Sequence, residues 1–179
     1  LDCSLSDDEL REIARMLRPY GRMTIRINHE CGGTWFTHNK RFTYEQVGKF
    51  FAHFSDIIHQ EAPNVRTVFC AGFAQADGKL EKEDEFAVAY RAADVWSADC
   101  YLALHYGWPY DVAEVGGGQY KADSVGMYYD MFRRTYERAS SQFGAKPLVT
   151  AEFNTDGDVT GPRHQGESVI RGTSRLEHK

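Results

Sequence analysis

Four polar side chains follow one another at the end of an apolar stretch near the start of the chain. Residues 25–35 read Ile-Arg-Ile-Asn-His-Glu-Cys-Gly-Gly-Thr-Trp, which places Arg26, Asn28, His29 and Glu30 close together. A carboxylate at the end of a buried strand is costly unless it has a partner or a chemical role. Two interpretations follow: a local salt bridge between Glu30 and Arg26, or a general acid that the strand delivers to a substrate.

A second carboxylate has an equivalent place in the sequence. Glu152 lies in Val-Thr-Ala-Glu-Phe-Asn at residues 149–154, which also reads as the end of an apolar strand. Glycoside hydrolysis requires one carboxylic acid and one carboxylate, about 5–5.5 Å apart in enzymes that retain the anomeric configuration. Their surroundings must separate their pKa values, so that one stays protonated and the other charged. Glu30 and Glu152 are therefore the predicted catalytic pair, with two structural carboxylates as the alternative.

Aromatic residues near the two carboxylates could hold a sugar. Trp35 follows Glu30 by five positions, Tyr101 ends another predicted strand, and His105 and Trp108 follow Tyr101 in a predicted loop. Trp and Tyr rings offer large apolar faces with a polar edge, which suits the C–H faces of sugar rings. Loop packing is the alternative for Trp108 and for Tyr110, which follows it in the same predicted loop. The predicted substrate-binding residues are His29, Trp35, Tyr101, Arg26, Asn28, His105 and Trp108.

The elements that must position these residues alternate between helix and strand. Two capping boxes, Ser-Asp-Asp-Glu at residues 6–9 and Thr-Tyr-Glu-Gln at residues 43–46, each precede apolar residues at helical spacing. Gly21 and Gly144 are predicted to end helices. Further helices are predicted over residues 82–93 and 124–143, and strands over residues 23–28, 65–70 and 148–153 and within 94–104.

Short apolar strands between helices indicate an α/β fold with a parallel sheet. An open doubly wound sheet and a (β/α)8 TIM barrel both fit the pattern. The barrel is favoured because polar residues follow each strand, and barrel active sites form at the carboxyl ends of the strands. We expect one partial TIM-barrel domain over residues 1–179, with about four βα units equivalent to the fourth to seventh strands. The first three units are then absent, and residues 155–179 hold at most a frayed helix.

Composition disfavours several other classes of protein. The chain has 179 residues, of which 42% are hydrophobic and 26% charged, and its net charge is -5. Nucleic-acid binding needs a basic surface, and a membrane span needs about 18 apolar residues, so neither partner is expected. The cysteines, Cys3, Cys31, Cys70 and Cys100, form no close pair, which disfavours zinc and leaves their disulfide state open. No cofactor is implied, because two carboxylates suffice for the predicted reaction.

Three segments resemble glycoside hydrolase family 26. The pattern Arg26-x-x-His29-Glu30-x-x-x-x-Trp35-Phe36 is similar to the acid/base motif of that family, R-x-x-H-E-M-N-G-x-W-F/Y. Residues 149–153 resemble its nucleophile strand, and residues 94–101 resemble its sixth-strand segment. The resemblance covers about residues 6–155. It implies a (β/α)8 barrel of clan A and a retaining hydrolase of β-mannan or another β-linked polysaccharide.

Carried over by position, the resemblance gives roles to individual residues. Glu30 would be the general acid/base and Glu152 the nucleophile. His29 and Trp35 would line the −1 subsite, Tyr101 would donate a hydrogen bond to the nucleophile, and Arg26 would hold the strand-end charges in place. The chain departs from the family at Cys31-Gly32, where Met-Asn is usual, and at Asn154, where Gly is frequent. Extracellular location is expected from the family alone.

Three other readings stay open. The chain could be a glycan-binding barrel fragment without turnover, or a half-barrel that assembles with a second half-barrel chain or as a homodimer. It could also be a metal-dependent barrel hydrolase that uses His29, Glu30, Asp99 and Glu152 as ligands. Binding without product would distinguish the first, and the mass in solution the second.

Overall fold

Four parallel strands form the main sheet of this α/β protein. The computed structural model describes residues 3–36, 40–75, 77–101 and 124–154. The strand order is β1-β2-β3-β5, and every neighbouring pair is parallel. A separate two-stranded parallel sheet joins β4 to β6. The strands are β1 (Met23–Arg26), β2 (Val65–Phe69), β3 (Val95–Ser97), β4 (Cys100–Tyr101), β5 (Leu148–Val149) and β6 (Phe153–Asn154).

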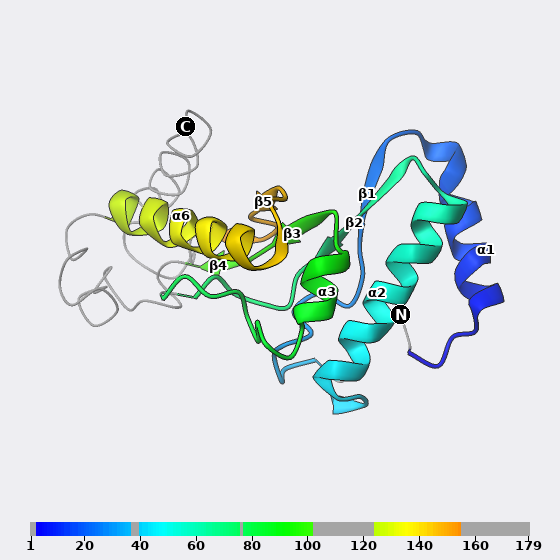
Figure 1. Ribbon diagram of the computed structural model, residues 1–179, viewed down its shortest axis with the longest axis horizontal. Helices are drawn as coiled ribbons and strands as arrows, with labels where there is room; N and C mark the ends of the chain where they lie inside the picture. The colour runs from blue at the N-terminus through cyan, green and yellow to red at the C-terminus, as the bar shows by residue number, and fades with distance from the viewer. Residues whose placement is uncertain (1–2, 37–39, 76, 102–123, 155–179) are drawn as a thin grey trace.

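The helices follow the strands in the same sequential order. Figure 1 shows them succeeding one another across the molecule, and α1 contacts α2, α2 contacts α3, and α3 contacts α6. Within the described strands the order does not reverse, so the switch point of a doubly wound sheet is not among them. The arrangement is that of consecutive βα units. The helical elements are α1 (Asp7–Leu17), the 3-10 turn η1 (Arg18–Tyr20), α2 (Tyr44–Glu61), α3 (Ala87–Ala92) and α6 (Ser124–Phe143).

Local sequence signals set the ends of three helices. In both predicted capping boxes, at Ser6 and at Thr43, the side-chain and backbone hydrogen bonds are present, so these predictions are confirmed. Gly144 follows α6 with a φ of 84°, a conformation that glycine adopts without a steric cost. The first helix ends earlier than predicted, at Leu17, and the 3-10 turn extends it to Gly21, whose φ is 73°.

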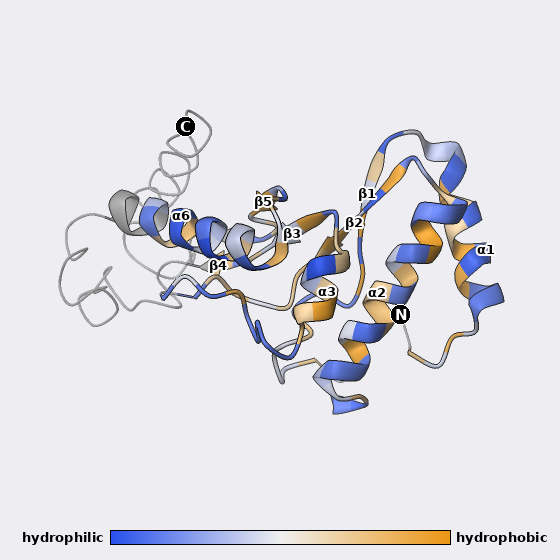
Figure 2. Cartoon of the chain, viewed as in Figure 1, coloured by the Kyte–Doolittle hydropathy of each residue, from blue (hydrophilic) through white to orange (hydrophobic). Residues whose placement is uncertain are grey.

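The hydrophobic core lies between the sheet and the helices. It joins Leu10 of α1, Phe54 of α2, Phe69 of β2 and Trp96 of β3, each at most 1% exposed. Figure 2 shows hydrophobic and hydrophilic residues on the same helices, as amphipathic packing requires. Thr24 and Arg66, on the alternate positions of β1 and β2, are exposed. The helices therefore cover one face of this part of the sheet.

The predicted helix over residues 82–93 is too long. Turns occupy residues 81–86, and α3 begins only at Ala87. Lys82 has a φ of 49°, which a helix interior cannot accommodate. The buried carboxylate of Glu83 accepts hydrogen bonds from the backbone N–H of Leu80 and from the Arg138 guanidinium of α6, and so holds the turn open.

Two predicted strands are each divided in the structure. The stretch within 94–104 forms β3 and β4, and the stretch 148–153 forms β5 and β6. Ser97 pairs with Val149 and Cys100 pairs with Phe153, so two residues on one chain segment stand opposite three on the other. One extra residue opposite a partner strand is the pattern of a β-bulge, which turns a side chain away from the regular alternation. Residue 152 lies within this irregularity.

Lys146 holds the carboxyl end of the short helix α3. Its Nζ donates to the carbonyl oxygens of Tyr90 (3.3 Å), Ala93 (2.7 Å) and Arg91. We expect Lys146→Met to lower the free energy of unfolding by about 1–2 kcal/mol, because a charged donor to three carbonyls is lost where water enters only partly. Urea unfolding measures the change. Lys49→Met, which removes an exposed pair with Glu45 inside α2, should leave the midpoint almost unchanged. Equal midpoints for both variants would contradict this role of Lys146.

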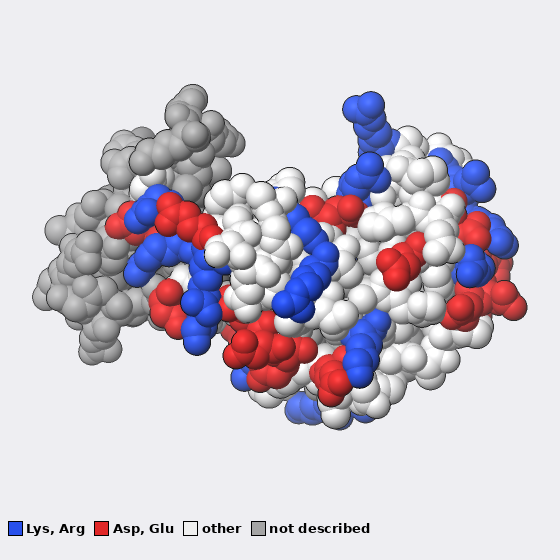
Figure 3. All heavy atoms as spheres, viewed as in Figure 1, with Lys and Arg blue, Asp and Glu red and all other residues white. Residues whose placement is uncertain are grey.

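Charged side chains are interspersed over the surface. Figure 3 shows acidic and basic groups in small clusters on this face of the described residues, without one extended basic area. Within the described part of the chain, no helix has the length and hydrophobicity to cross a membrane. All four cysteines are free thiols, and three of them are buried. Burial raises the pKa of Cys70 and of Cys100 to about 12, so these thiols stay protonated at neutral pH.

Candidate active site

Glu30 lies in a tight turn that follows β1. Its backbone φ is 52°, and that of Asn28 is 47°. Asn tolerates this left-handed conformation well, whereas a Glu there stores strain of the kind that is concentrated at functional sites. The backbone N–H of Glu30 donates to the carbonyl oxygen of Cys70 (2.9 Å), at the end of the neighbouring strand. Glu30 is 6% exposed, so the turn presents a largely buried carboxylate at the carboxyl end of the sheet.

Aromatic side chains surround the carboxylate of Glu30. The indole Nε1–H of Trp35 donates to Glu30 Oε2 (2.8 Å). The Trp35 ring lies beside Phe73, with ring centroids 5.4 Å apart, and His29 packs edge-on against Phe36 at 5.0 Å. Trp35 remains 51% exposed, so one part of its ring binds the acid while another part is open to a ligand. The predicted proximity of Glu30, His29 and Trp35 is thus present in the structure.

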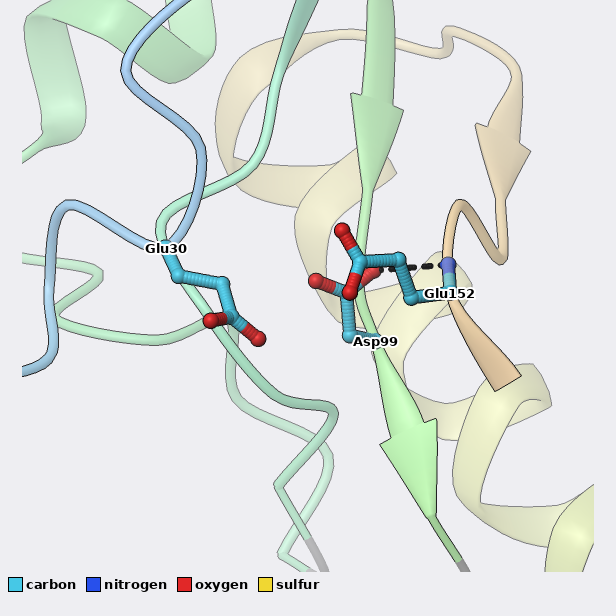
Figure 4. Close-up of side chains that lie close together, drawn as sticks. All are labelled: Glu30, Asp99 and Glu152. Atoms are coloured by element: carbon cyan, nitrogen blue, oxygen red, sulfur yellow. Dashed lines mark hydrogen bonds between the residues drawn. The ribbon is translucent and has the colours of Figure 1, made fainter. Parts of the chain in front are cut away.

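Glu152 and Asp99 face Glu30 from other segments of the chain. Figure 4 shows the three carboxyl groups directed toward one another. One oxygen from each group lies within 4.8 Å of the others. The backbone N–H of Glu152 donates to Asp99 Oδ1 (2.9 Å), which replaces a regular ladder bond at the irregular pairing of β5 and β6. Residues distant in the sequence therefore meet where the strands end.

Arg26 binds the carboxylates of the distant segments. Its Nη2 donates to Glu152 Oε1 (2.8 Å), and its Nη1 lies 3.8 Å from Asp99 Oδ1. From the sequence, Arg26 could form a salt bridge with Glu30 or hold the charges at the strand ends in place. The structure shows Arg26 bonded to Glu152 and close to Asp99, both of which lie on distant segments of the chain. Arg26 supplies the positive charge that allows several acidic groups to converge.

Asp99 carries the clearest electrostatic perturbation in this cluster. Its pKa is raised from 3.8 to about 6. Burial is the main cause, and the charges of Glu152 and Glu30 add to it. The Cys70 thiol, which donates to Asp99 Oδ2 (3.3 Å), and Arg26 oppose the shift. Asp99 therefore binds its proton at a higher pH than an exposed aspartate does.

The raised pKa of Asp99 makes a prediction for the pH dependence of stability. Between pH 4 and 6 the folded protein binds a proton at Asp99 that the unfolded chain has released, so stability falls as the pH rises. A shift of about 2 units corresponds to roughly 3 kcal/mol as an upper bound. Asp99→Asn keeps an acceptor for Glu152 N–H and should flatten this slope when unfolding is followed at pH 4, 5, 6 and 7. A slope equal to that of the unchanged protein would show that Asp99 does not titrate in this range.

Several predicted site residues cannot be compared with the structure. His105, Trp108 and the side chain of Tyr101 lie outside the described residues. The backbone of Tyr101 does lie in β4, beside Asn154 of β6, and so next to the strand that follows Glu152. Asn28, like Glu30, has a left-handed backbone conformation in the turn. Its substrate contact stays a prediction.

The predicted catalytic and substrate-binding set did not include Asp99, and it omitted Phe73. Asp99 was considered as a strand-end acid and as a metal ligand only. Its place after an apolar strand is the same signal that pointed to Glu30 and Glu152, and it could have been used in the same way. No sequence pattern pointed to Phe73, because its contact with Trp35 joins two loops that are far apart in the sequence.

The three carboxyl groups could also be considered as metal ligands. Their oxygens lie within 4.8 Å of one another, and carboxylates suit hard divalent cations. Arg26 is already bonded to Glu152 and close to Asp99, so a metal ion would have to share these acids with a guanidinium. His29, the fourth ligand of the metal reading, is not in this cluster. These residues therefore fit a carboxyl cluster neutralised by an arginine better than a binding site for a divalent metal ion.

An open pocket of about 830 Å³ lies at the opposite end of the strands. It includes Met23 and Thr24 at the start of β1 and Arg66 near the start of β2. None of its lining residues belongs to the carboxyl cluster. The chemistry-bearing groups, rather than this pocket, therefore define the candidate site.

Comparison with known protein families and with curated proteins finds no match to this chain. The chemistry of the site is therefore inferred from its own residues: two glutamates and an aspartate that converge at the carboxyl ends of parallel strands, with an arginine on one side and a half-exposed tryptophan on the other.

Proposed function

We propose that this chain is a retaining glycoside hydrolase, with Glu30 as general acid/base and Glu152 as nucleophile. One observation carries the proposal: an oxygen of Glu30 lies within 4.8 Å of an oxygen of Glu152. Retaining enzymes hold the two carboxyl groups about 5–5.5 Å apart, whereas inverting enzymes leave about 6.5–9.5 Å for a water molecule. The close approach supports direct attack by one carboxylate on the sugar.

The surroundings of the two glutamates support this division of roles. The guanidinium of Arg26 bonds Glu152, and a cationic partner stabilises the charged form that a nucleophile needs. Glu30 is buried and accepts a hydrogen bond from the neutral indole of Trp35. Glu152 then attacks the anomeric carbon while Glu30 protonates the glycosidic oxygen. In the second step Glu30, now a carboxylate, takes a proton from the water that displaces Glu152.

The substrate class and the barrel are part of the same proposal. The sequential parallel strands fit a portion of a (β/α)8 barrel, in which acids at the strand ends face one cleft. The resemblance of the Arg26–Phe36 segment to glycoside hydrolase family 26 favours a β-mannan-like or other β-linked polysaccharide as substrate. Trp35, half exposed beside Glu30, offers a ring face for a sugar. The family also favours an exported protein.

Release of reducing ends from soluble β-mannan, mixed-linkage β-glucan and β-1,3-xylan tests the proposal. Proton NMR of the first product should show the same anomeric configuration as the substrate. Activity should be unchanged after dialysis against a chelator, since Arg26 rather than a metal ion balances the acids. Inverted product, or activity that is lost with the chelator and restored by a divalent cation, would overturn the mechanism.

The binding alternative is tested on the same samples. Affinity electrophoresis in gels that contain each polysaccharide measures binding without requiring turnover. Retardation of the chain with no product after prolonged incubation would reject hydrolysis by this chain and favour a glycan-binding fragment. The mass in solution, measured by light scattering, tests whether a second copy completes a half-barrel.

A further inference from the structure

The turn that carries Glu30 is pinned to the residues that follow β2. Besides the bond from Glu30 N–H to Cys70, the backbone N–H of Gly32 donates to the carbonyl oxygen of Ala71 (2.7 Å). The hydroxyl of Tyr44, from α2, donates to the carbonyl oxygen of Gly32 (3.1 Å). The turn is therefore held by backbone bonds on one side and by a helix on the other.

Glu81 packs against this turn at a distance that only glycine permits. A Cβ added at Gly32 would lie 2.8 Å from Glu81 Cγ and 2.8 Å from Ala71 O. A Cβ added at Gly72 would lie 2.9 Å from Glu81 Cγ. The methylene stem of Glu81 thus covers two glycines from two different strand-end turns. Both turns leave space for the same side chain.

Hydrogen bonds from Tyr90 and Gln75 hold Glu81 in place. The hydroxyl of Tyr90, which is 1% exposed, donates to the backbone carbonyl of Glu81 (2.7 Å). Gln75 Nε2 donates both to the Glu81 carboxylate and to the carbonyl oxygen of Phe73 (3.1 Å). Burial raises the pKa of Glu81, whose carboxylate has an amide as its hydrogen-bond partner here. The stem is therefore supported by a buried helix residue and by its own loop.

The position of the turn is transmitted to Glu30 through Trp35. A Cβ added at Gly33 would lie 2.2 Å from the Trp35 ring, so the indole rests directly on the backbone of Gly33. The same indole donates the hydrogen bond to Glu30 Oε2. A shift of Gly32 and Gly33 would therefore move the indole and the carboxyl group together.

We propose that Glu81 is a positioning residue for Glu30: its stem clamps the Gly32 turn against Gly72 and thereby fixes the Trp35 indole on the acid. This inference rests on the proposed function for its kinetic consequence, but not for its structural one. A displacement of 1 Å at a reacting group costs about 10²-fold in rate, so a loosened turn should cost roughly tenfold. In this proposal Glu81 acts through the turn rather than on the substrate, and its role depends on the stem rather than on its charge.

Three variants separate positioning from general stability. Glu81→Ala removes the stem, Glu81→Gln keeps it, and Glu85→Ala removes an exposed acid from the same loop as a matched control. The indole N–H signal of Trp35, identified by its loss in Trp35→Phe, reports the bond to Glu30 in nitrogen-15 NMR spectra. We expect Glu81→Ala to move this signal and to lower kcat about tenfold with little change in KM. Glu81→Gln and Glu85→Ala should change neither the Trp35 signal nor kcat.

Each arm has an outcome that overturns the inference. A folded Glu81→Ala variant with an unchanged Trp35 signal would overturn the positioning role. Equal losses of kcat in Glu81→Gln and Glu81→Ala would overturn it as well. A signal change at Trp96 as large as that at Trp35 would show a general structural role. If Glu81→Ala does not fold, Gly72→Ala pushes the stem away and must move the Trp35 signal. A protein without hydrolytic activity would reject the proposed function, while the NMR comparison would still decide the positioning role.

Discussion

Glu30→Gln should lower the rate on an unactivated β-linked polysaccharide by roughly 10²–10⁴-fold, because an amide cannot protonate the leaving oxygen. The amide can still accept the hydrogen bond from Trp35, so the fold should be retained. On a dinitrophenyl glycoside, whose leaving group needs no acid, the first step should remain fast. The second step should then be slow, because Glu30 no longer activates water. Steady-state and burst kinetics on the two substrates measure this contrast.

Azide provides the decisive control for Glu30→Gln. As an anionic nucleophile it needs no general base, so it should restore turnover of the dinitrophenyl glycoside and yield a glycosyl azide. Glu12→Gln, an exposed substitution on α1, should behave like the unchanged protein on both substrates. Full activity of Glu30→Gln on the polysaccharide would exclude Glu30 as the acid. Equal losses on both substrates, without azide rescue, would assign it another role.

Arg26→Leu should lower the free energy of unfolding by about 3 kcal/mol at neutral pH, because it leaves Asp99 and Glu152 close together without a cation. The folded variant should bind protons at these acids more readily than the unfolded chain does. Its stability should therefore fall as the pH rises from 4 to 7, more steeply than that of the unchanged protein. The difference between the two proteins should be largest at pH 7 and small at pH 4, as measured by urea unfolding at each pH.

Arg66→Leu is the matched control for Arg26→Leu. Arg66 lies on the neighbouring strand β2, and its guanidinium donates to the backbone carbonyl oxygens of Pro63 and Val65. Its replacement should have a small effect that does not depend on pH. A loss in Arg26→Leu that is equal at pH 4 and pH 7 would mean that packing, and not neutralisation of the carboxyl cluster, is the contribution of Arg26.

The parts of the fold that were predictable from sequence are set by contacts between near neighbours. Both capping boxes span four residues, and both are formed as predicted. The positions of the strands follow from short apolar runs, and α6 has the predicted bounds, Ser124–Phe143. Glu30, His29 and Trp35 lie within a few positions of one another, so their proximity was also open to prediction.

What sequence could not show depends on contacts between distant segments. The break between β5 and β6 follows from the bond between Glu152 N–H and Asp99, whose partners are far apart in the chain. The delayed start of α3 follows from the contact of Glu83 with Arg138. The hydrogen bond from Arg26 to Glu152 likewise joins residues that lie far apart in the sequence. In each case the hydrogen bond is made by a polar side chain whose partner lies far away in the sequence.

The most direct test of the central claim is to trap the glycosyl-enzyme. Dinitrophenyl 2-deoxy-2-fluoro glycosides of mannobiose and cellobiose slow the second step, so a retaining enzyme accumulates its covalent intermediate. Mass spectrometry of the intact protein, followed by peptide mapping, locates the sugar. We predict one fluoroglycosyl group per chain, on Glu152, and none on Glu152→Gln. A label on another residue, or no label in a sample that hydrolyses the parent polysaccharide, would contradict the assignment of Glu152 as nucleophile.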